Sequence, residues 1–388
     1  MTANRLLCAG LAAGFACGWT PTTAFAQANV DLNAWTEITT DSNGFWDVDN
    51  NGQEGSGPNG TFVRQEVNGA PTIFLSPDNF INTQINGSFS VDPTSDNDFI
   101  GFVFGVQNPS SSTLDALLFD WKQGNQSGAT EGFRLSYVTG DINNSVSTSN
   151  PFWTHTTNAN TTFQPLGTNF NSEFGWVDGG PTVYDFALDY SQTNITITIA
   201  GGQFGLAGLE VFNVDVDDTD VSAIFPDGAF PDGQFGFYNF SQTGVIYESF
   251  TRTDDPVLAS TPVDGGTLDF GNVRVTGSAT EALDIVNAGG PGSTLTGSVP
   301  SPDDPAFALI TAPDSFTLGE GATAAVDYTF TPITRGSFAD ELNVASNDPA
   351  DLDGHDFTLA GQGVGPVLDA PLTADFGDVD ADGSASVF

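Results

Sequence analysis

The stretch DNDFIGFVFGVQ, residues 96–107, indicates the fold class of this protein. One face of the strand expected here carries Ile100, Phe102, Phe104 and Val106. The opposite face alternates Phe and Val with glycine, and the glycines would let a neighbouring layer approach closely. Alternation with a period of two residues is typical of a strand in a β-sandwich rather than of a helix.

The same alternation recurs elsewhere in the chain. Residues 184–190 (YDFALDY) and 194–199 (NITITI) show it, and Gly, Asn, Asp and Pro separate such runs throughout. No segment after residue 26 has a sustained helical period. The 33 phenylalanines supply the volume for a packed core. The sequence therefore predicts an all-β protein built from sandwiches.

Three further stretches are also unusual in composition. They are FDWKQGNQ (119–126), FWTHTTN (152–158) and DGQFGFYNFSQ (232–242). Together the four resemble the C-terminal lectin-like domain of thrombospondins, in its bacterial secreted form, over residues 30–250. The resemblance implies a calcium-binding, concanavalin A-like (jelly-roll) sandwich of the legume-lectin type. It also implies that the domain works by adhesion rather than catalysis.

A candidate metal site lies directly before the strand expected at residues 99–106. Two carboxylates and an amide at a strand entrance offer several oxygens to one Ca²⁺. The resemblance implies calcium sites in loops along the sandwich edge, where the WKQGNQ loop would also contribute. The predicted calcium ligands are Asp96, Asn97, Asp98 and Asn125. The alternative interpretation is an Asx-turn that starts the strand without a metal.

Two single residues invite a functional interpretation. Lys122 is the only lysine of the chain, and we expect a structural ion pair or a hydrogen bond across the sheet rather than a ligand contact. His155 has no second histidine or cysteine nearby, which a zinc or catalytic site would need. In the family a Trp-His pair is adjacent here, whereas Thr154 separates Trp153 from His155. We therefore expect His155 to be structural.

Two acidic runs lie outside the candidate site. Residues 47–52 (DVDNNG) match the first half of an EF-hand loop, but Pro58 stands where a bidentate glutamate is required. A hairpin is therefore expected there. Residues 215–220 (DVDDTD) are a denser cluster, and their composition fits either a calcium loop or a solvated loop.

A second pattern begins near residue 254, beyond which Phe and Asn become rarer, and no Trp occurs after Trp176. From there to residue 364 the chain resembles the immunoglobulin-like module of the ASPM/SPD-2/Hydin type. The matching positions are Phe270, Gly271, Asn287, Gly289, Phe330, Thr331, Pro332, Gly336, Ser346, Asn347, Asp348, Gly361, Gln362 and Gly363. Gly and Asn at turns, with β-branched residues between them, fit a sandwich of this size.

An internal repeat follows this module. Residues 366–385 (PVLDAPLTADFGDVDADGSA) echo residues 256–279 (PVLASTPVDGGTLDFGNVRVTGSA). The expected organisation is a lectin-like sandwich over 27–253, an immunoglobulin-like module over 254–364, and the start of a further, truncated module over 365–388.

Residues 1–26 have the pattern of a signal peptide. An apolar run over 6–15 is followed by Ala-Phe-Ala at 24–26, with small residues at the −3 and −1 positions of a cleavage site. We expect cleavage after Ala26 and a secreted or cell-surface protein. Both cysteines, Cys8 and Cys17, lie in this segment, so the mature chain would contain no disulfide.

The charge balance excludes one class of partner and argues against another. Seven Lys and Arg stand against 49 Asp and Glu, which gives a net charge of −42. Nucleic acid is not an expected partner, because phosphate binding needs clustered basic residues. Anionic membrane surfaces are unfavourable for the same electrostatic reason.

No catalytic motif is recognisable in the sequence. There is no G-x-S-x-G, no H-E-x-x-H and no E-x-D-x-x-E run of the kind that glycoside hydrolases use on this type of sandwich. The glycine-rich run Gly289–Gly292 lacks the lysine and the strand-to-helix context of a phosphate-binding loop. We therefore expect that the protein is not an enzyme.

The predicted function is that of an exported calcium-binding adhesion or matrix protein of the bacterial surface. Its first domain would bind an extracellular glycan or protein ligand, and the later modules would act as spacers. One alternative is a carbohydrate-binding lectin in which an exposed aromatic, Trp153 or Trp176, stacks on a sugar. The other is a polysaccharide hydrolase whose carboxylates come together from distant strands.

Overall fold

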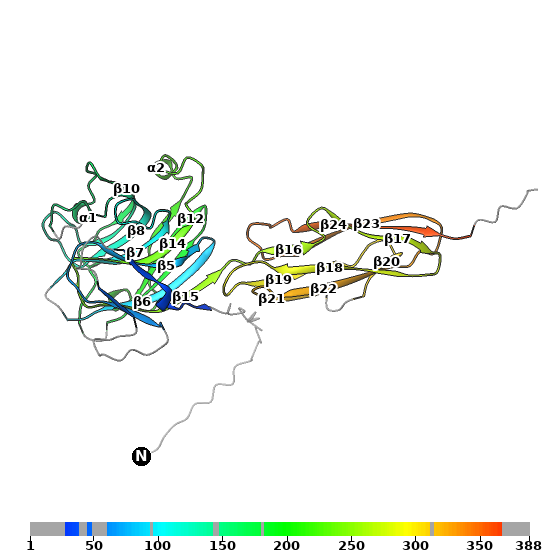
Figure 1. Cartoon of the computed structure of the whole chain (residues 1–388), viewed down its shortest axis with the longest axis horizontal. Coiled ribbons are helices and arrows are strands. Elements are labelled where there is room, and N and C mark those ends of the chain that lie inside the picture. The colour runs from blue at the N-terminus through cyan, green and yellow to red at the C-terminus, as the bar shows by residue number, and fades with distance from the viewer. Residues whose placement is uncertain are drawn as a thin grey trace, which may run out of the picture.

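The computed structural model describes residues 28–38, 45–48, 60–93, 96–142, 147–179, 182–310 and 314–366. Within these residues the chain forms two β-sandwich domains that lie end to end (Figure 1). This confirms the expected fold class, a concanavalin A-like (jelly-roll) sandwich followed by an immunoglobulin-like one. The predicted signal peptide, and all but the first two residues of the predicted truncated module, lie outside the described residues.

One sheet of the first domain has eight strands, all paired antiparallel. In spatial order these are β13 (Leu209–Asp215), β12 (Asn194–Gly201), β11 (Tyr184–Tyr190), β6 (Thr83–Val91), β15 (Val245–Asp254), β4 (Phe62–Gln65) and β3 (Trp46–Val48), with β1 (Ala28–Asn29) beside β15. The alternation in β11 and β12 is observed as expected: their aromatic and aliphatic side chains are buried and the intervening ones are more exposed.

The opposing sheet has seven strands. They are β10 (Thr161–Asn169), β9 (Gly132–Gly140), β8 (Leu114–Lys122), β7 (Phe99–Val106), β14 (Gly233–Phe240), β5 (Thr72–Phe80) and β2 (Thr36–Ile38). Strand β7 lies in the middle of the sheet, between β8 and β14. All eight of its residues are buried, so both faces of the sheet are covered at this point.

Two apolar clusters account for this burial. The larger one fills the space between the sheets and includes Ile100, Phe102 and Phe104. The smaller one includes Phe99 and Val103 and lies on the other face of β7. Phe152 and Trp153, from the short helix α1 (Pro151–Thr154), belong to this second cluster, so α1 helps to cover the outer face of the sheet.

The expectation for Val106 is wrong. Val106 belongs to the outer cluster with Val103, not to the inner one with Phe104. The pairing of β7 with β14 shifts register at this end, and Gly105 adopts a left-handed φ of +60°. A bulge inserts one residue and therefore turns the following side chain to the opposite face.

The second domain packs a four-stranded sheet on a five-stranded sheet. The first contains β16 (Leu258–Thr261), β18 (Ala279–Asn287), β22 (Thr323–Phe330) and β20 (Phe307–Leu309). The second contains β17 (Gly266–Arg274), β24 (His355–Val364), β23 (Gly336–Ser346), β19 (Thr294–Ser298) and β21 (Ser315–Gly319). A separate core, which includes Phe270, Tyr328 and Phe330, joins them.

The remaining helical elements are single turns. They are η1 (Leu32–Ala34), η2 (Gly202–Phe204) and α2 (Thr219–Ser222). No helix among the described residues is long and apolar enough to cross a bilayer.

Candidate functional site

The predicted metal ligands Asp96, Asn97 and Asp98 form the entrance to β7. The backbone N–H of Asp98 donates to Oε1 of Gln242 at 3.0 Å, and the Asp98 carbonyl accepts from the Trp176 indole at 3.3 Å. Gln242 is fully buried in the turn between β14 and β15. The loop is therefore fixed by contacts to distant parts of the sandwich.

Lys122, at the end of β8, lies beside this loop. Its ammonium donates to Asp98 Oδ1 at 2.9 Å, to the Asn97 carbonyl at 2.5 Å, and to side-chain oxygens of Asn97 and Gln126, each at 3.2 Å. It also lies 5.3 Å from the ring centre of Phe99. The Lys122 side chain is fully buried, which confirms the expected structural ion pair. Burial lowers the pKa of Lys122, and the Asp98 charge opposes that shift.

Asp96 lies on the other side of Asn97 in the same loop. Its carboxylate accepts a hydrogen bond from the Asn68 side chain and one at 3.2 Å from the Asn97 backbone N–H. Burial and the neighbouring Asp98 carboxylate raise the pKa of Asp96 to about 6. Two carboxylates thus lie close together at one end of β7, beside the ammonium of Lys122.

Three of the four predicted ligands, Asp96, Asn97 and Asp98, lie together at the entrance of β7. The side-chain oxygens of Asn97 and Asn125, however, accept hydrogen bonds from other groups of the protein. Asn97 Oδ1 accepts from Lys122, and Asn125 Oδ1 accepts from the Glu131 backbone N–H at 3.0 Å. Among the described residues, no three His, Cys, Asp or Glu side chains are grouped so that they could hold a metal ion. Calcium binding by these residues stays a prediction.

A second buried polar cluster, not anticipated from the sequence, crosses the outer face of the same sheet. Asp120 and Arg134 are cross-strand partners on β8 and β9, and their charged groups lie 3.8 Å apart. His155, the left-handed C-cap of α1, bonds to Asp120 through Nε2. This ties the covering helix to the sheet and fits the structural role expected for His155. Burial and Asp120 raise the pKa of nearby Tyr238 well above its ordinary value.

The two tryptophans proposed for sugar stacking are not exposed. Trp153 is 2% and Trp176 is 1% exposed. Trp153 packs edge-on against Phe99 and Phe240. Rings this deeply buried cannot stack on a sugar, so the alternative in which Trp153 or Trp176 does so is wrong.

The two acidic runs have different outcomes. Strand β3 spans Trp46–Val48, so the first run begins in a strand, and the turn of the expected hairpin lies outside the described residues. In the other run, Asp215 Oδ1 accepts from the Asp217 backbone N–H at 2.8 Å, and Asp218 Oδ2 accepts from the Asp215 N–H at 3.3 Å. These carboxylates therefore bond to the backbone of their own exposed turn.

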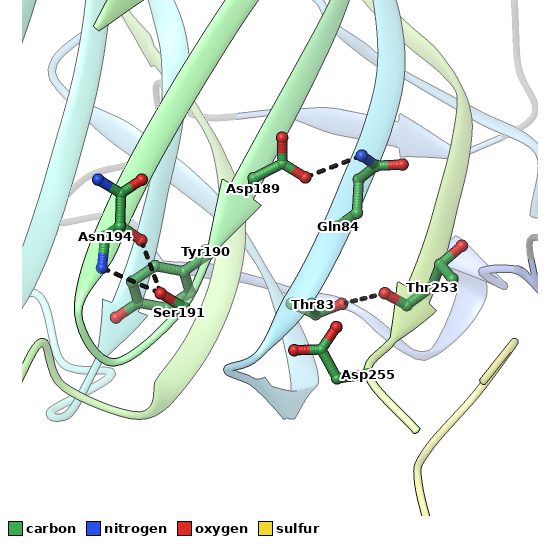
Figure 2. A pocket seen from close by; sticks show the side chains of 8 residues that line it. All are labelled: Thr83, Gln84, Asp189, Tyr190, Ser191, Asn194, Thr253 and Asp255. Atoms are coloured by element: carbon green, nitrogen blue, oxygen red, sulfur yellow. Dashed lines mark hydrogen bonds between the residues drawn. The ribbon is translucent and has the colours of Figure 1, made fainter. Parts of the chain in front are cut away.

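A pocket of about 270 Å³ lies at the other end of β15, next to the second domain. It is lined by Thr83, Gln84, Asp189, Tyr190, Ser191, Asn194, Thr253 and Asp255. Figure 2 shows Ser191 and Asn194 on one side of it and Thr83 and Asp255 on the other. Burial and the charges of Asp254, Asp348 and Asp189 raise the pKa of Asp255.

Comparisons with protein families give two matches. The thrombospondin C-terminal region matches residues 43–253, and a HYDIN/CFA65/VesB-like, Ig-like domain matches residues 262–361. Their order confirms the order of domains in the resemblance read from the sequence. No curated protein matches the chain.

Several solved structures are similar to parts of the chain. A protein of unknown function with a galectin-like fold from Bacillus subtilis is 12% identical, with a TM-score of 0.36 over 59% of this chain and 92% of that one. The carbohydrate binding module CBM66 from Bacillus subtilis is 10% identical, with a TM-score of 0.34 over 56% and 94%. The metal-free exoplasmic/lumenal domain of VIP36 is 10% identical, with a TM-score of 0.36 over 57% and 84%.

Proposed function

Because the chain belongs to the thrombospondin C-terminal region family, we propose that its first domain is a calcium-stabilised adhesion domain. The domain would bind an extracellular glycan or protein ligand without catalysis. The proposal includes export with cleavage after Ala26 and display at the bacterial surface. With a net charge of −42, nucleic acid and anionic membranes are not among the proposed partners.

The close approach of two carboxylates at the entrance of β7 is the observation that carries the calcium proposal. Asp96 and Asp98 lie near each other, and burial and the Asp98 charge raise the pKa of Asp96. A cation bound between these carboxylates would lower the raised pKa of Asp96 and favour its charged form. Carboxylate oxygens are the donors that Ca²⁺ prefers. Bound calcium would supply that charge.

The donor set fits calcium in part. Asp96 and Asp98 would hold the ion through their carboxylates, while Lys122 keeps the loop in place. The side-chain oxygens of Asn97 and Asn125 already accept hydrogen bonds, so either amide would have to exchange its partner for the metal. The structure therefore favours the two aspartates as the principal ligands.

Thermal unfolding of the mature chain from Gln27 tests the calcium part. We expect the midpoint to rise with Ca²⁺ but not with equimolar Mg²⁺, because binding to the folded state stabilises it by about 2.7 kcal/mol at a hundredfold excess over Kd. Asp96→Asn should abolish the rise. The matched control Asp227→Asn, at an exposed position, should retain it. A wild-type midpoint that is equal in calcium and chelator would remove calcium from the proposal.

Adhesion is tested separately with the calcium-loaded protein on a glycan array and on immobilised extracellular proteins. Saturable binding to either surface supports the proposal and identifies the ligand class. Incubation with soluble polysaccharides should release no new reducing ends. Product release would instead support the hydrolase alternative.

A further inference from the structure

The two domains are joined by only three residues, 255–257, between the end of β15 and the start of β16. Every backbone N–H in this region has a partner. Asp254 N–H donates to the Pro291 carbonyl and Asp255 N–H to the Asn82 carbonyl, each at 2.9 Å. The first of these bonds reaches the second domain, and the other returns to the first domain.

The following two N–H groups bond to buried side chains of the second domain. Val257 N–H donates to Asn287 Oδ1 at 3.4 Å, and Leu258 N–H donates to Asp348 Oδ2 at 2.8 Å. Asn287 is fully buried, and Asp348 is 3% exposed. Pro256 has no N–H to satisfy. The connecting segment is thus hydrogen-bonded like a strand and has no free backbone donor.

The glycine-rich run Gly289–Gly292, which has no role in a phosphate site, receives this segment. A Cβ at Gly289 would overlap the carbonyl oxygen of Asp255. At Gly290 it would overlap the carboxylate of Asp254. Only glycine lets the two backbones approach this closely.

A side-chain lock holds the Asp254 carboxylate in place. Arg252 donates to it twice, from Nε at 2.5 Å and from Nη2 at 2.7 Å. The guanidinium also lies 4.3 Å from the ring centre of Phe80. A bidentate arginine on an aromatic face is a well-oriented pair, so Asp254 is fixed relative to the first domain while its N–H bonds to the second.

We propose that residues 252–258 and 287–292 form a rigid interdomain dock that fixes the orientation of the immunoglobulin-like domain. The module that is expected to act as a spacer would thereby be a stiff extension of the first domain. Seven residues of β15, 245–251, separate this dock from the turn that carries Gln242, which bonds to Asp98. At roughly 3.3 Å per residue, the candidate site lies about 23 Å from the dock, at the opposite end of the first domain. The immunoglobulin-like domain therefore extends away from the candidate site and leaves it accessible.

Distance measurements between two spin labels test the dock. The mature chain is expected to contain no cysteine, so Glu210→Cys on β13 and Glu281→Cys on β18 provide one exposed label position in each domain. We expect one narrow distance distribution, the same with calcium and with chelator. A broad distribution in this otherwise unchanged chain would overturn the proposal, because unrestrained domains move relative to each other by default.

Two glycine variants in the labelled chain show whether the glycine run is responsible. Gly290→Ala should broaden the distribution by about twofold or more, because the added methyl group displaces the Asp254 carboxylate. Gly319→Ala is the matched control, since nothing lies within 4 Å of its Cβ. Equal widths for these two variants would contradict the role given to Gly290.

If Gly290→Ala does not fold, Arg252→Ala replaces it. This change frees the Asp254 carboxylate without entering either core, so broadening is expected here too. An unchanged narrow distribution for Arg252→Ala would show that the Arg252–Asp254 pair does not fix the relative orientation of the two domains. A calcium-independent narrow distribution together with an absent calcium shift in unfolding would leave the dock intact and reject only the calcium proposal.

Discussion

The ammonium of Lys122 lies 2.9 Å from Oδ1 of Asp98, and these side chains are 0% and 4% exposed. This is the only lysine of the chain, and it neutralises a carboxylate at the entrance of the central strand β7. An ion pair removed from water is costly to break, because the remaining charge has no compensation. The stability of the loop that carries the candidate calcium ligands therefore depends on Lys122.

Lys122→Met should lower the free energy of unfolding by about 3–5 kcal/mol, because it leaves Asp98 charged and buried. Chemical denaturation at neutral pH measures the change. Adding Asp98→Asn to this variant should recover part of the loss. Arg274→Met is the control, because this side chain is exposed on β17 and its loss should change the free energy of unfolding little. Equal losses for the two single variants would contradict this interpretation.

Asp96 should make stability depend on pH. Its pKa is raised from 3.8 to about 6, so its contribution is fully present below pH 3.8 and is lost as the pH rises through 6. In chelator, Asp96→Asn should therefore stabilise the protein at pH 8, by about 1 kcal/mol after allowance for solvent screening. With calcium present the same variant should be less stable than the wild type. If wild-type stability rose between pH 4 and 7 and Asp96→Asn abolished that rise, the predicted direction of the pH dependence would be wrong.

Two buried tyrosines differ in their hydroxyl contacts. Tyr238 Oη has no hydrogen-bond partner among the described residues, whereas Tyr247 Oη lies 2.8 Å from the Tyr238 carbonyl and 3.0 Å from Asn239 Oδ1. Tyr247→Phe should destabilise the fold by about 1–3 kcal/mol, and Tyr238→Phe should be neutral or stabilising. Urea unfolding of both variants provides the comparison. A larger loss for Tyr238→Phe would indicate an internal water at that hydroxyl.

Asp255 should weaken the interdomain dock at neutral pH. Burial and the carboxylates around it raise its pKa, so its favourable contribution is present at low pH and is lost as the pH rises through the raised value. Asp255→Asn should raise the unfolding midpoint at pH 7. It should also make the midpoint decrease less as the pH rises above 4. Asp303→Asn, at an exposed position in the second domain, should change neither. A lower midpoint for Asp255→Asn would mean that the charge is needed.

The local pattern predicted strands more accurately than contacts. The alternation in residues 184–190 and 194–199 gave two observed strands with the expected buried faces. It placed Val106 on the wrong face, because the bulge at Gly105 depends on the pairing of β7 with β14. The alternative with an exposed Trp153 is wrong for a similar reason, since that ring is covered only because α1 folds back onto a distant strand.

By itself the sequence determined the all-β fold class, the order of the two sandwiches and the structural role of Lys122. Period-two alternation, turn residues and charge are local properties of the sequence. They predict strands regardless of which strands become neighbours in a sheet. The tertiary structure alone decided that Lys122 lies against Asp98, that His155 reaches Asp120, and that Gly289 and Gly290 receive the interdomain segment. These contacts join residues far apart in the chain, and only the packing of strands and domains brings them within hydrogen-bond distance.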